Sequence, residues 1–235
     1  MSIAENIQVL QERIAVAARR AGRRTPEEIA LMAVTKTHPA SRIREAYEAG
    51  LRLFGENRVQ EFAGKAAGLA GLSGAQWHMI GHLQTNKASK AAELFGAVDS
   101  VDSVKLAEKL DASARKTGAT IGVLIEVNVG GEAAKSGVAP DSTELEELLK
   151  AAPRLQGLHF GGLMTVPPHT DDPEGARSFF RSLRALRDGI ARRRLPAVGM
   201  ETLSMGMSHD FEVAIEEGST CVRVGTAIFG ERSQK

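Results

Sequence analysis

Short apolar runs alternate along the chain with longer stretches in which apolar residues recur every three or four positions. The short runs are often β-branched, and several are apolar at successive positions, which is typical of strands buried on both faces of a parallel sheet. Eight such runs lie at residues 29–36, 51–57, 76–81, 97–102, 122–129, 157–164, 201–206 and 221–230. The pattern therefore predicts eight strands with helical segments between them.

The longer stretches carry helix start and stop signals. Glu5 lies in an amphipathic N-terminal segment whose acidic residues argue against a signal peptide. Ser41 is a candidate N-cap, Gly118 a candidate stop, and Pro173 falls in a first turn, where proline is favoured. We predict helices at residues 1–22, 41–49, 104–117, 141–152 and 172–194.

The alternation of strands and helices predicts the fold class. Eight βα units over 235 residues fit a (β/α)8 TIM barrel, with an extra N-terminal helix outside it. An open doubly wound sheet is the alternative, but no glycine-rich GxGxxG follows the first strand. No long Pro/Ser-rich linker interrupts the chain, so we expect one domain spanning residues 1–235.

Composition narrows the possible partners. Lys plus Arg number 30 and Asp plus Glu 29, so no net charge drives the chain towards nucleic acid or lipid. The arginines at 19–20, 23–24 and 192–194 lie at helix ends, where they complement the helix dipole. No apolar run approaches the roughly 20 residues that span a bilayer. We expect a cytoplasmic protein that binds neither membrane nor nucleic acid.

The single cysteine, Cys221, cannot form a disulfide within the chain. It lies in an apolar strand, and we interpret it as a small core residue. His78 and His82 have the spacing of a helical metal pair, but they straddle a strand and the loop after it. We therefore expect them to point apart and expect no metal.

Polar residues gather where the predicted strands end. The active sites of such barrels lie at the C-terminal ends of the strands. Each residue alone could be a loop residue facing water, but together they indicate a pocket. These residues are Lys36, Asn57, His82, Gln84, Asn86, Lys87, Ser204, Ser208, Arg223, Gly225 and Thr226.

Two of these clusters indicate phosphate. Barrels often bind phosphate with the loops after strands seven and eight, and "SMGMS" and "RVGTAIFG" occupy those positions with hydroxyls and glycines. Lys36, at the end of strand one, could pair with a phosphate or form a Schiff base with a carbonyl. The residue types alone leave a cofactor-free aldolase open.

A family resemblance narrows this choice. "AVTKTHP", "FGENRVQE", "WHMIGHLQTNK", "KSGV", "GGLMT" and "LSMGMSHDFEVAIEEGSTCVRVGTAIFG" together resemble the pyridoxal phosphate homeostasis protein family. These proteins are single-domain relatives of the alanine racemase barrel, and the resemblance runs from about residue 3 to residue 232. It implies a role in buffering or delivering pyridoxal 5′-phosphate (PLP), and so in intracellular vitamin B6 homeostasis, with no established turnover.

The resemblance also implies roles for single residues. Lys36 would hold PLP as an internal aldimine, and Asn57 would lie near the ring. Arg223 would face the pyridine nitrogen. The residues implied around the phosphate are Ser204, Gly206, Gly225 and Thr226.

The residues themselves agree with the implied role of Arg223. It shares strand parity with Cys221 and Gly225, so it can point into the barrel. A buried arginine needs an acceptor, and a pyridine nitrogen is one. Because arginine keeps its proton, the ring nitrogen would stay unprotonated.

The alternative function is a PLP-dependent racemase of a small amino acid. Racemisation needs a base on each face of the substrate, and Lys36 can serve only one. The only tyrosine, Tyr47, falls in the helix after strand one, where we expect it to face away from the mouth of the barrel. The chain ends directly after the barrel, so we expect no second domain to bring another base. His82 is the best substitute by position, so we expect weak racemase-like activity at most.

Further partners follow from the same interpretation. We expect PLP-dependent apoenzymes as recipients of the cofactor, and a monomer. Lys135, in a glycine-rich loop, is most simply solvent-exposed, but it could be a second amine that binds the aldehyde transiently.

Overall fold

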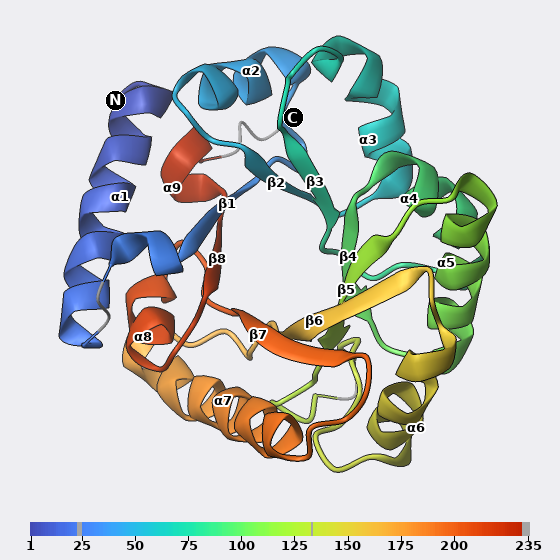
Figure 1. Cartoon of the computed structure of the whole chain (residues 1–235). Helices are drawn as coiled ribbons and strands as arrows, with labels where there is room; N and C mark the ends of the chain where they lie inside the picture. The colour runs from blue at the N-terminus through green and yellow to red at the C-terminus, as the bar shows by residue number, and fades with distance from the viewer. Residues whose placement is uncertain (23–24, 133, 232–235) are drawn as a thin grey trace.

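Eight parallel strands close into a ring at the centre of the molecule (Figure 1). This computed structural model describes residues 1–22, 25–132 and 134–231. Each strand pairs with the next along the chain, and β8 pairs with β1. The barrel prediction is confirmed and the open-sheet alternative is wrong. The strands are β1 Ala30–Val34, β2 Leu53–Glu56, β3 Gln76–Met79, β4 Ala97–Val101, β5 Ile121–Glu126, β6 Leu158–Met164, β7 Val198–Ser204 and β8 Cys221–Val224.

Helices surround the ring and cover the outer face of the strands (Figure 1). The expected N-terminal helix, α1, lies outside the barrel against α2, α8 and α9. It begins with a capping box in which Ser2 and Glu5 bond each other's backbone N–H groups. The helices are α1 Ile3–Arg20, α2 Ala40–Glu48, α3 Val59–Ala66, α4 Ala88–Leu94, α5 Val104–Thr117, α6 Thr143–Ala151, α7 Arg177–Arg192, α8 Phe211–Glu216 and α9 Thr226–Phe229.

Two local predictions are wrong. The predicted strand at 221–230 stops at Val224, and its second half is α9. Gly225 separates the two, and periodicity cannot tell a buried strand from a one-turn helix in so short an apolar run. Ser41 does not cap α2, because the helix already begins at Ala40 with Pro39 at the N-cap position. The predicted stop at Gly118 is confirmed, with φ +68°.

Aromatic packing joins the barrel to its helices. Phe54 of β2 stacks on Trp77 of β3 with ring centroids 4.8 Å apart, and Phe62 of α3 lies 4.8 Å from Trp77. Phe95, after α4, continues the cluster at 4.9 Å from Phe62. Burying each such ring contributes about 1.5–3 kcal/mol. The cluster therefore fixes α3 and α4 against the outer face of β2 and β3.

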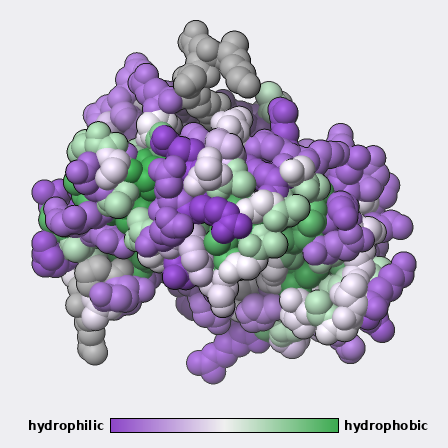
Figure 2. Space-filling model, turned by 90° about the horizontal axis from the view of Figure 1, so that it is seen from above, coloured by the Kyte–Doolittle hydropathy of each residue, from purple (hydrophilic) through white to green (hydrophobic). Residues whose placement is uncertain are grey.

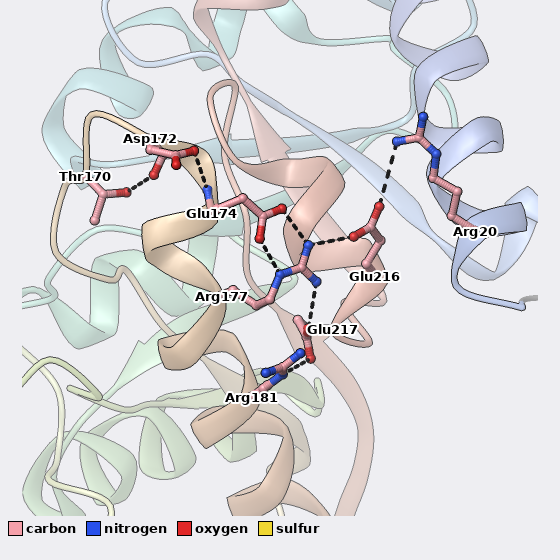
Figure 3. Close-up of polar contacts among 8 residues, drawn as sticks. All are labelled: Arg20, Thr170, Asp172, Glu174, Arg177, Arg181, Glu216 and Glu217. Atoms are coloured by element: carbon pink, nitrogen blue, oxygen red, sulfur yellow. Dashed lines mark hydrogen bonds and ion pairs between the residues drawn. The ribbon is translucent and has the colours of Figure 1, made fainter.

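A network centred on Arg177 ties three helices together (Figure 3). Arg177, at the start of α7, contacts Glu174 in the preceding turn. Its two Nη atoms reach Glu216 and Glu217 of the α8 segment, each at 2.7 Å. Arg20 of α1 lies 3.9 Å from Glu216. The network therefore anchors the C-terminal end of α8, the helix that follows the loop after β7.

The outer helix faces are mostly charged. Figure 2 shows the molecule from above, turned by 90° relative to Figure 1, and this face is largely hydrophilic with smaller hydrophobic patches. Arg193, after α7, pairs with Glu146 through both guanidinium Nη atoms at 2.6 and 2.8 Å, whereas Arg23 and Arg24 lie outside the described residues. In the part of the chain that the structure describes, no helix has the length and apolarity needed to cross a bilayer.

Candidate functional site

A pocket of about 260 Å³ opens at the C-terminal ends of β1 and β8. Two of the polar strand ends singled out in the sequence meet there, since Lys36 follows β1 and Arg223 belongs to β8. The loop after β7 also contributes to its lining. The lining residues are Val34, Lys36, His38, Met207, Ser208, His209, Arg223, Gly225, Thr226 and Gly230. The first and last strands of the barrel therefore share one pocket.

Lys36 stands at the beginning of a tight turn. Its side chain is half-buried, and the next residue, Thr37, has φ +66°, which a β-branched residue rarely adopts. Glu61 of α3 accepts a hydrogen bond from the Thr37 backbone N–H at 2.5 Å. Such a conformation persists only when its surroundings enforce it. The turn is therefore held by α3 and not by its own preference.

Lys65 of α3 stabilises the same turn through hydrogen bonds and ion pairs. Its Nζ donates to the carbonyl oxygens of Thr35 at 2.9 Å and His38 at 3.3 Å. It also pairs with Glu56 at 2.8 Å and Glu61 at 3.0 Å. Burial raises the pKa of Glu56, and hydrogen bonds from Lys65 and Thr35 oppose the rise. Lys65 thus clamps both ends of the turn that presents Lys36.

Arg223 points into the barrel, as its strand parity predicts. The residue is only 4 % exposed. Its Nη1 donates to the Ser204 hydroxyl at 2.8 Å and its Nη2 donates to the Thr165 carbonyl at 2.7 Å. The guanidinium carries more N–H donors than these two bonds use. Burial lowers its pKa, and the nearby carboxylates oppose that fall. Arg223 therefore forms a fixed, cationic floor for the pocket.

The segments that follow β7 and β8 bring hydrogen-bond donors to the pocket. Ser208 and Thr226 bring hydroxyls to the pocket, and the Ser208 hydroxyl accepts a bond from the Ala227 N–H at 3.4 Å. Among the described residues, the backbone N–H groups of Ser208, His209 and Thr226 bond no protein acceptor. Met207 N–H, in contrast, donates to the Asp210 carboxylate. Several unpaired donors around one space suit a compact anion.

Two of the residues expected at the phosphate are not part of the pocket lining. Ser204 is fully buried and accepts the bond from Arg223, and Gly206 packs on α8, where a Cβ would lie 2.5 Å from the Cβ of Ala214. Neither lines the pocket. The sequence suggests that Ser208 opens the helix after strand seven, but α8 begins only at Phe211, and Ser208 lines the pocket. The hydroxyl that faces the pocket depends on the path of the loop, which composition does not specify.

A carboxyl that the sequence did not flag lies at the end of β5. Glu126 is 8 % exposed and its Oε2 has no hydrogen-bond partner. Its pKa is raised to about 7, mainly by burial and also by the charge of Asp102, while the charge of Arg223 opposes the rise. A polar residue closing an apolar run, as in "GVLIEVNV", is the same signal that marked Lys36. Glu126 can therefore hold or release a proton near neutral pH.

Other candidates lie away from the pocket or have structural partners. Asn57 directly follows β2, and its backbone packs on Gly81 without lining the pocket. His78 and His82 contact different carboxylates, at 3.0 Å from Asp99 and 3.4 Å from Asp102. Among the described residues, no group of three His, Cys, Asp or Glu side chains is placed to hold a metal.

Three further expectations concern single side chains. Tyr47 faces away from the mouth, as expected, and its hydroxyl donates to the Ser73 carbonyl at 2.8 Å. Cys221 is a buried core residue, as expected, and burial raises the pKa of its thiol to about 12. Lys135 is less exposed than its loop predicts, because its ammonium pairs with Glu132 and donates to the Pro167 carbonyl.

Comparison with known proteins identifies the family. The alanine racemase N-terminal domain model matches residues 3–233. The pyridoxal phosphate homeostasis protein of Aquifex aeolicus is 47 % identical over 233 residues, which cover 99 % of each chain. The chain belongs to the pyridoxal phosphate homeostasis protein family. The Escherichia coli K12 member is 42 % identical over 98 % of this chain and 97 % of its own.

A solved structure similar to this chain contains PLP. PipY of Synechococcus elongatus, determined with PLP bound, is 37 % identical and superimposes with a TM-score of 0.83 over 97 % of this chain and 100 % of its own. The pocket described above has the groups that PLP requires, namely an amine, unpaired donors for a phosphate and a buried guanidinium. The residues present therefore fit this cofactor.

Proposed function

We propose that this protein binds PLP and serves intracellular vitamin B6 homeostasis. The observation that carries the proposal is the gathering of a half-buried lysine, a buried arginine and unpaired backbone N–H groups around one pocket. PipY, a relative with PLP bound, supports the choice of cofactor. When bound, PLP would supply a reactive aldehyde and an electron-withdrawing ring.

Each residue of the site has a proposed task. Lys36 supplies the amine that holds the cofactor covalently, and Arg223 donates to the pyridine nitrogen. Ser204 supports this through its hydrogen bond with the guanidinium, while Asn57 lies towards the ring. Gly206 lets the loop after β7 turn back towards the barrel, because its φ of +93° disfavours other residues. The phosphate is held by Gly225, Thr226 and, as an addition from the geometry, Ser208.

We propose that the protein is not an efficient enzyme. A racemase needs a second base opposite Lys36, and Tyr47 is committed to the outside of the barrel. The alternative, a racemase of a small amino acid, is favoured by one observation, the buried Glu126 with its pKa near 7. Without a placed second base, a rate loss of about 10²–10⁴-fold is expected.

The partners, the cellular location and the oligomeric state are also proposals. PLP-dependent apoenzymes are the recipients of the cofactor, and the protein acts in the cytoplasm as a single-domain monomer. A chain with one cysteine and no internal disulfide suits a reducing compartment. One arginine near the end of each of α1 and α7 pairs with a carboxylate, Arg20 with Glu216 and Arg193 with Glu146, which supports the absence of a nucleic-acid role.

The covalent assignment is tested by trapping. Borohydride reduction of the PLP-loaded protein, followed by digestion and mass spectrometry, should place the pyridoxyl group on Lys36. Lys36→Ala should abolish the trapped adduct, whereas Lys135→Ala, the matched control, should leave it in place. An adduct that sits mainly on Lys135, with Lys36 unmodified, would show that the assignment is wrong.

The catalytic alternative is tested in heavy water. The PLP-loaded protein is incubated with L-alanine, and both α-proton exchange and D-alanine are followed. Slow exchange with little D-isomer supports the carrier function. Turnover near the enzyme median of about 10 s⁻¹, lost in Glu126→Gln or His82→Ala, would establish the racemase instead.

A further inference from the structure

Among the described residues, no carboxylate is in direct contact with the positive charge of Arg223. Its Nη1 and Nη2 atoms donate to the Ser204 hydroxyl and the Thr165 carbonyl, and both acceptors are neutral. A buried cation needs negative charge in its surroundings. The carboxylates that supply it from beyond contact distance belong to Asp99, Glu126 and Asp210.

Glu126 differs from the other two carboxylates. Asp99 Oδ1 contacts the ring of His78 at 3.0 Å, and the Asp210 carboxylate accepts the Met207 N–H at 2.6 Å. Glu126 has no such bond, and its Oε2 is buried without a partner. A buried carboxylate oxygen without a donor is destabilising while it is charged, and protonation removes that charge. Of the three carboxylates, Glu126 is therefore the one whose charge the structure holds least firmly.

Strand parity places Glu126 inside the barrel. Leu124 of β5 lines a cavity at the N-terminal end of the barrel, and Glu126 follows it at the same parity. Cys221 lines the same cavity, and Arg223 follows it in β8 in the same way. Both charged side chains therefore point into the interior, one layer nearer the pocket at Lys36. Glu126 keeps 8 % of its surface exposed, so it can exchange a proton with water.

Two charged groups act on Glu126 from other strands. Burial is the main reason that its pKa reaches about 7; the charge of Asp102, directly after β4, adds to the rise and the guanidinium of β8 opposes it. Asp102 itself lies 3.4 Å from His82. Uncharged neighbours cover the other sides, with Met164 paired to it on β6 and Gly137 packed on its side chain. A change in nearby charge therefore changes how much of Glu126 is protonated near neutral pH.

We propose that Glu126 acts through Arg223 as a positioning residue: it takes up a proton from the solvent when an anionic ligand enters the pocket at Lys36, and releases the proton when the ligand leaves. Before the ligand binds, the carboxylate partly balances the charge of Arg223. A ligand such as PLP brings a phosphate dianion and takes over that task. Negative charges that share one cation repel each other, so Glu126 becomes neutral. This inference rests on the proposed binding of PLP.

The test is the number of protons taken up when PLP binds to the cofactor-free protein. Calorimetric titration at about pH 7.5, in two buffers of different ionisation enthalpy that lack primary amines, gives this number. PLP and Lys36 also titrate, so the informative quantity is the difference between the wild type and Glu126→Gln. If the ligand raises the pKa of Glu126 by about one unit, the wild type should take up about half a proton more. Glu147→Gln, which removes an exposed carboxylate of α6, should match the wild type.

The affinity for PLP supplies a second measurement. Proton uptake and binding are linked reciprocally, so between about pH 6 and about pH 8.5 the Kd should rise about 5–10-fold more in the wild type than in Glu126→Gln. Asp102→Asn keeps the glutamate and removes a charge that raises its pKa. This variant should therefore move the pH dependence of the Kd to lower pH. A glutamate with a merely structural role would give neither effect.

A larger proton uptake in the wild type than in Glu126→Gln, with a Kd that rises more steeply with pH, supports the inference. Equal uptake in the two proteins would overturn it and leave PLP binding intact. If Glu126→Gln does not fold, Asp102→Asn decides, because an unchanged pH dependence in that variant would also overturn the inference. Failure of PLP to bind the wild-type protein at all would overturn the proposed function together with it.

Discussion

Replacing Glu126 with glutamine should remove a defined part of the pH dependence of stability. Burial is the main reason that the pKa of this carboxyl reaches about 7, against an ordinary value of 4.5. Because the folded-state value lies above the unfolded one, the folded protein holds the proton more tightly. The group therefore contributes stability that is fully present below about pH 4.5 and is lost as the pH rises through about 7.

The magnitude follows from the two pKa values. A difference of roughly 2.5 pKa units, at about 1.4 kcal/mol each, corresponds to about 3 kcal/mol. Glutamine cannot ionise, so the variant should not show this decline. It should match the wild type near pH 4.5 and exceed it by up to about 3 kcal/mol above pH 7.

The assay is urea unfolding of the cofactor-free protein at about pH 5 and about pH 8. The measured quantity is the change in unfolding free energy between the two pH values, compared across wild type, Glu126→Gln and Glu147→Gln. Glu147 lies exposed on α6 and is the matched control. If Glu126→Gln retains the full pH dependence of the wild type, the buried carboxyl does not ionise as argued and the reasoning fails.

Two further predictions concern ion pairs. Lys65→Met should destabilise the protein by about 3–5 kcal/mol, because it leaves the buried Glu56 without its cation. A PLP titration followed by absorbance should also show weaker binding. Unchanged PLP affinity would mean that the position of Lys36 does not depend on Lys65. Arg177→Met should lower the unfolding free energy by about 1–3 kcal/mol, since the guanidinium is only partly exposed. This loss of stability should become smaller in high salt, which screens the ion pairs. A loss that does not depend on salt would indicate packing as the cause.

Much of the barrel could be predicted from the sequence, because strands buried on both faces appear as apolar runs between helical segments. The position of Lys36 at the end of a predicted strand placed it at the barrel mouth, and strand parity predicted that Arg223 points into the barrel. Periodicity failed at α9, where four residues are too few to distinguish a helix from a strand.

The remaining site residues depend on contacts between distant segments. Ser208, rather than Ser204, faces the pocket because the loop after β7 turns at Gly206 before α8 begins. The support of the Thr37 turn by Lys65 comes from a helix whose sequence carries no sign of that role. The raised pKa of Glu126 likewise arises from burial that only the closed barrel provides.

The closure of the ring between β1 and β8 makes the pocket at Lys36 a product of the complete barrel. Lys36 follows the first strand and Arg223 lies in the last, nearly two hundred residues away along the chain, so neither half of the molecule can hold the ligand alone. A fold that depends on contacts this distant in sequence folds slowly. A ligand that bridges them would stabilise the closed ring, by a free energy that grows with the logarithm of its free concentration once this exceeds Kd. The free energy needed to open the β1–β8 pairing locally would then depend on how much free cofactor is available.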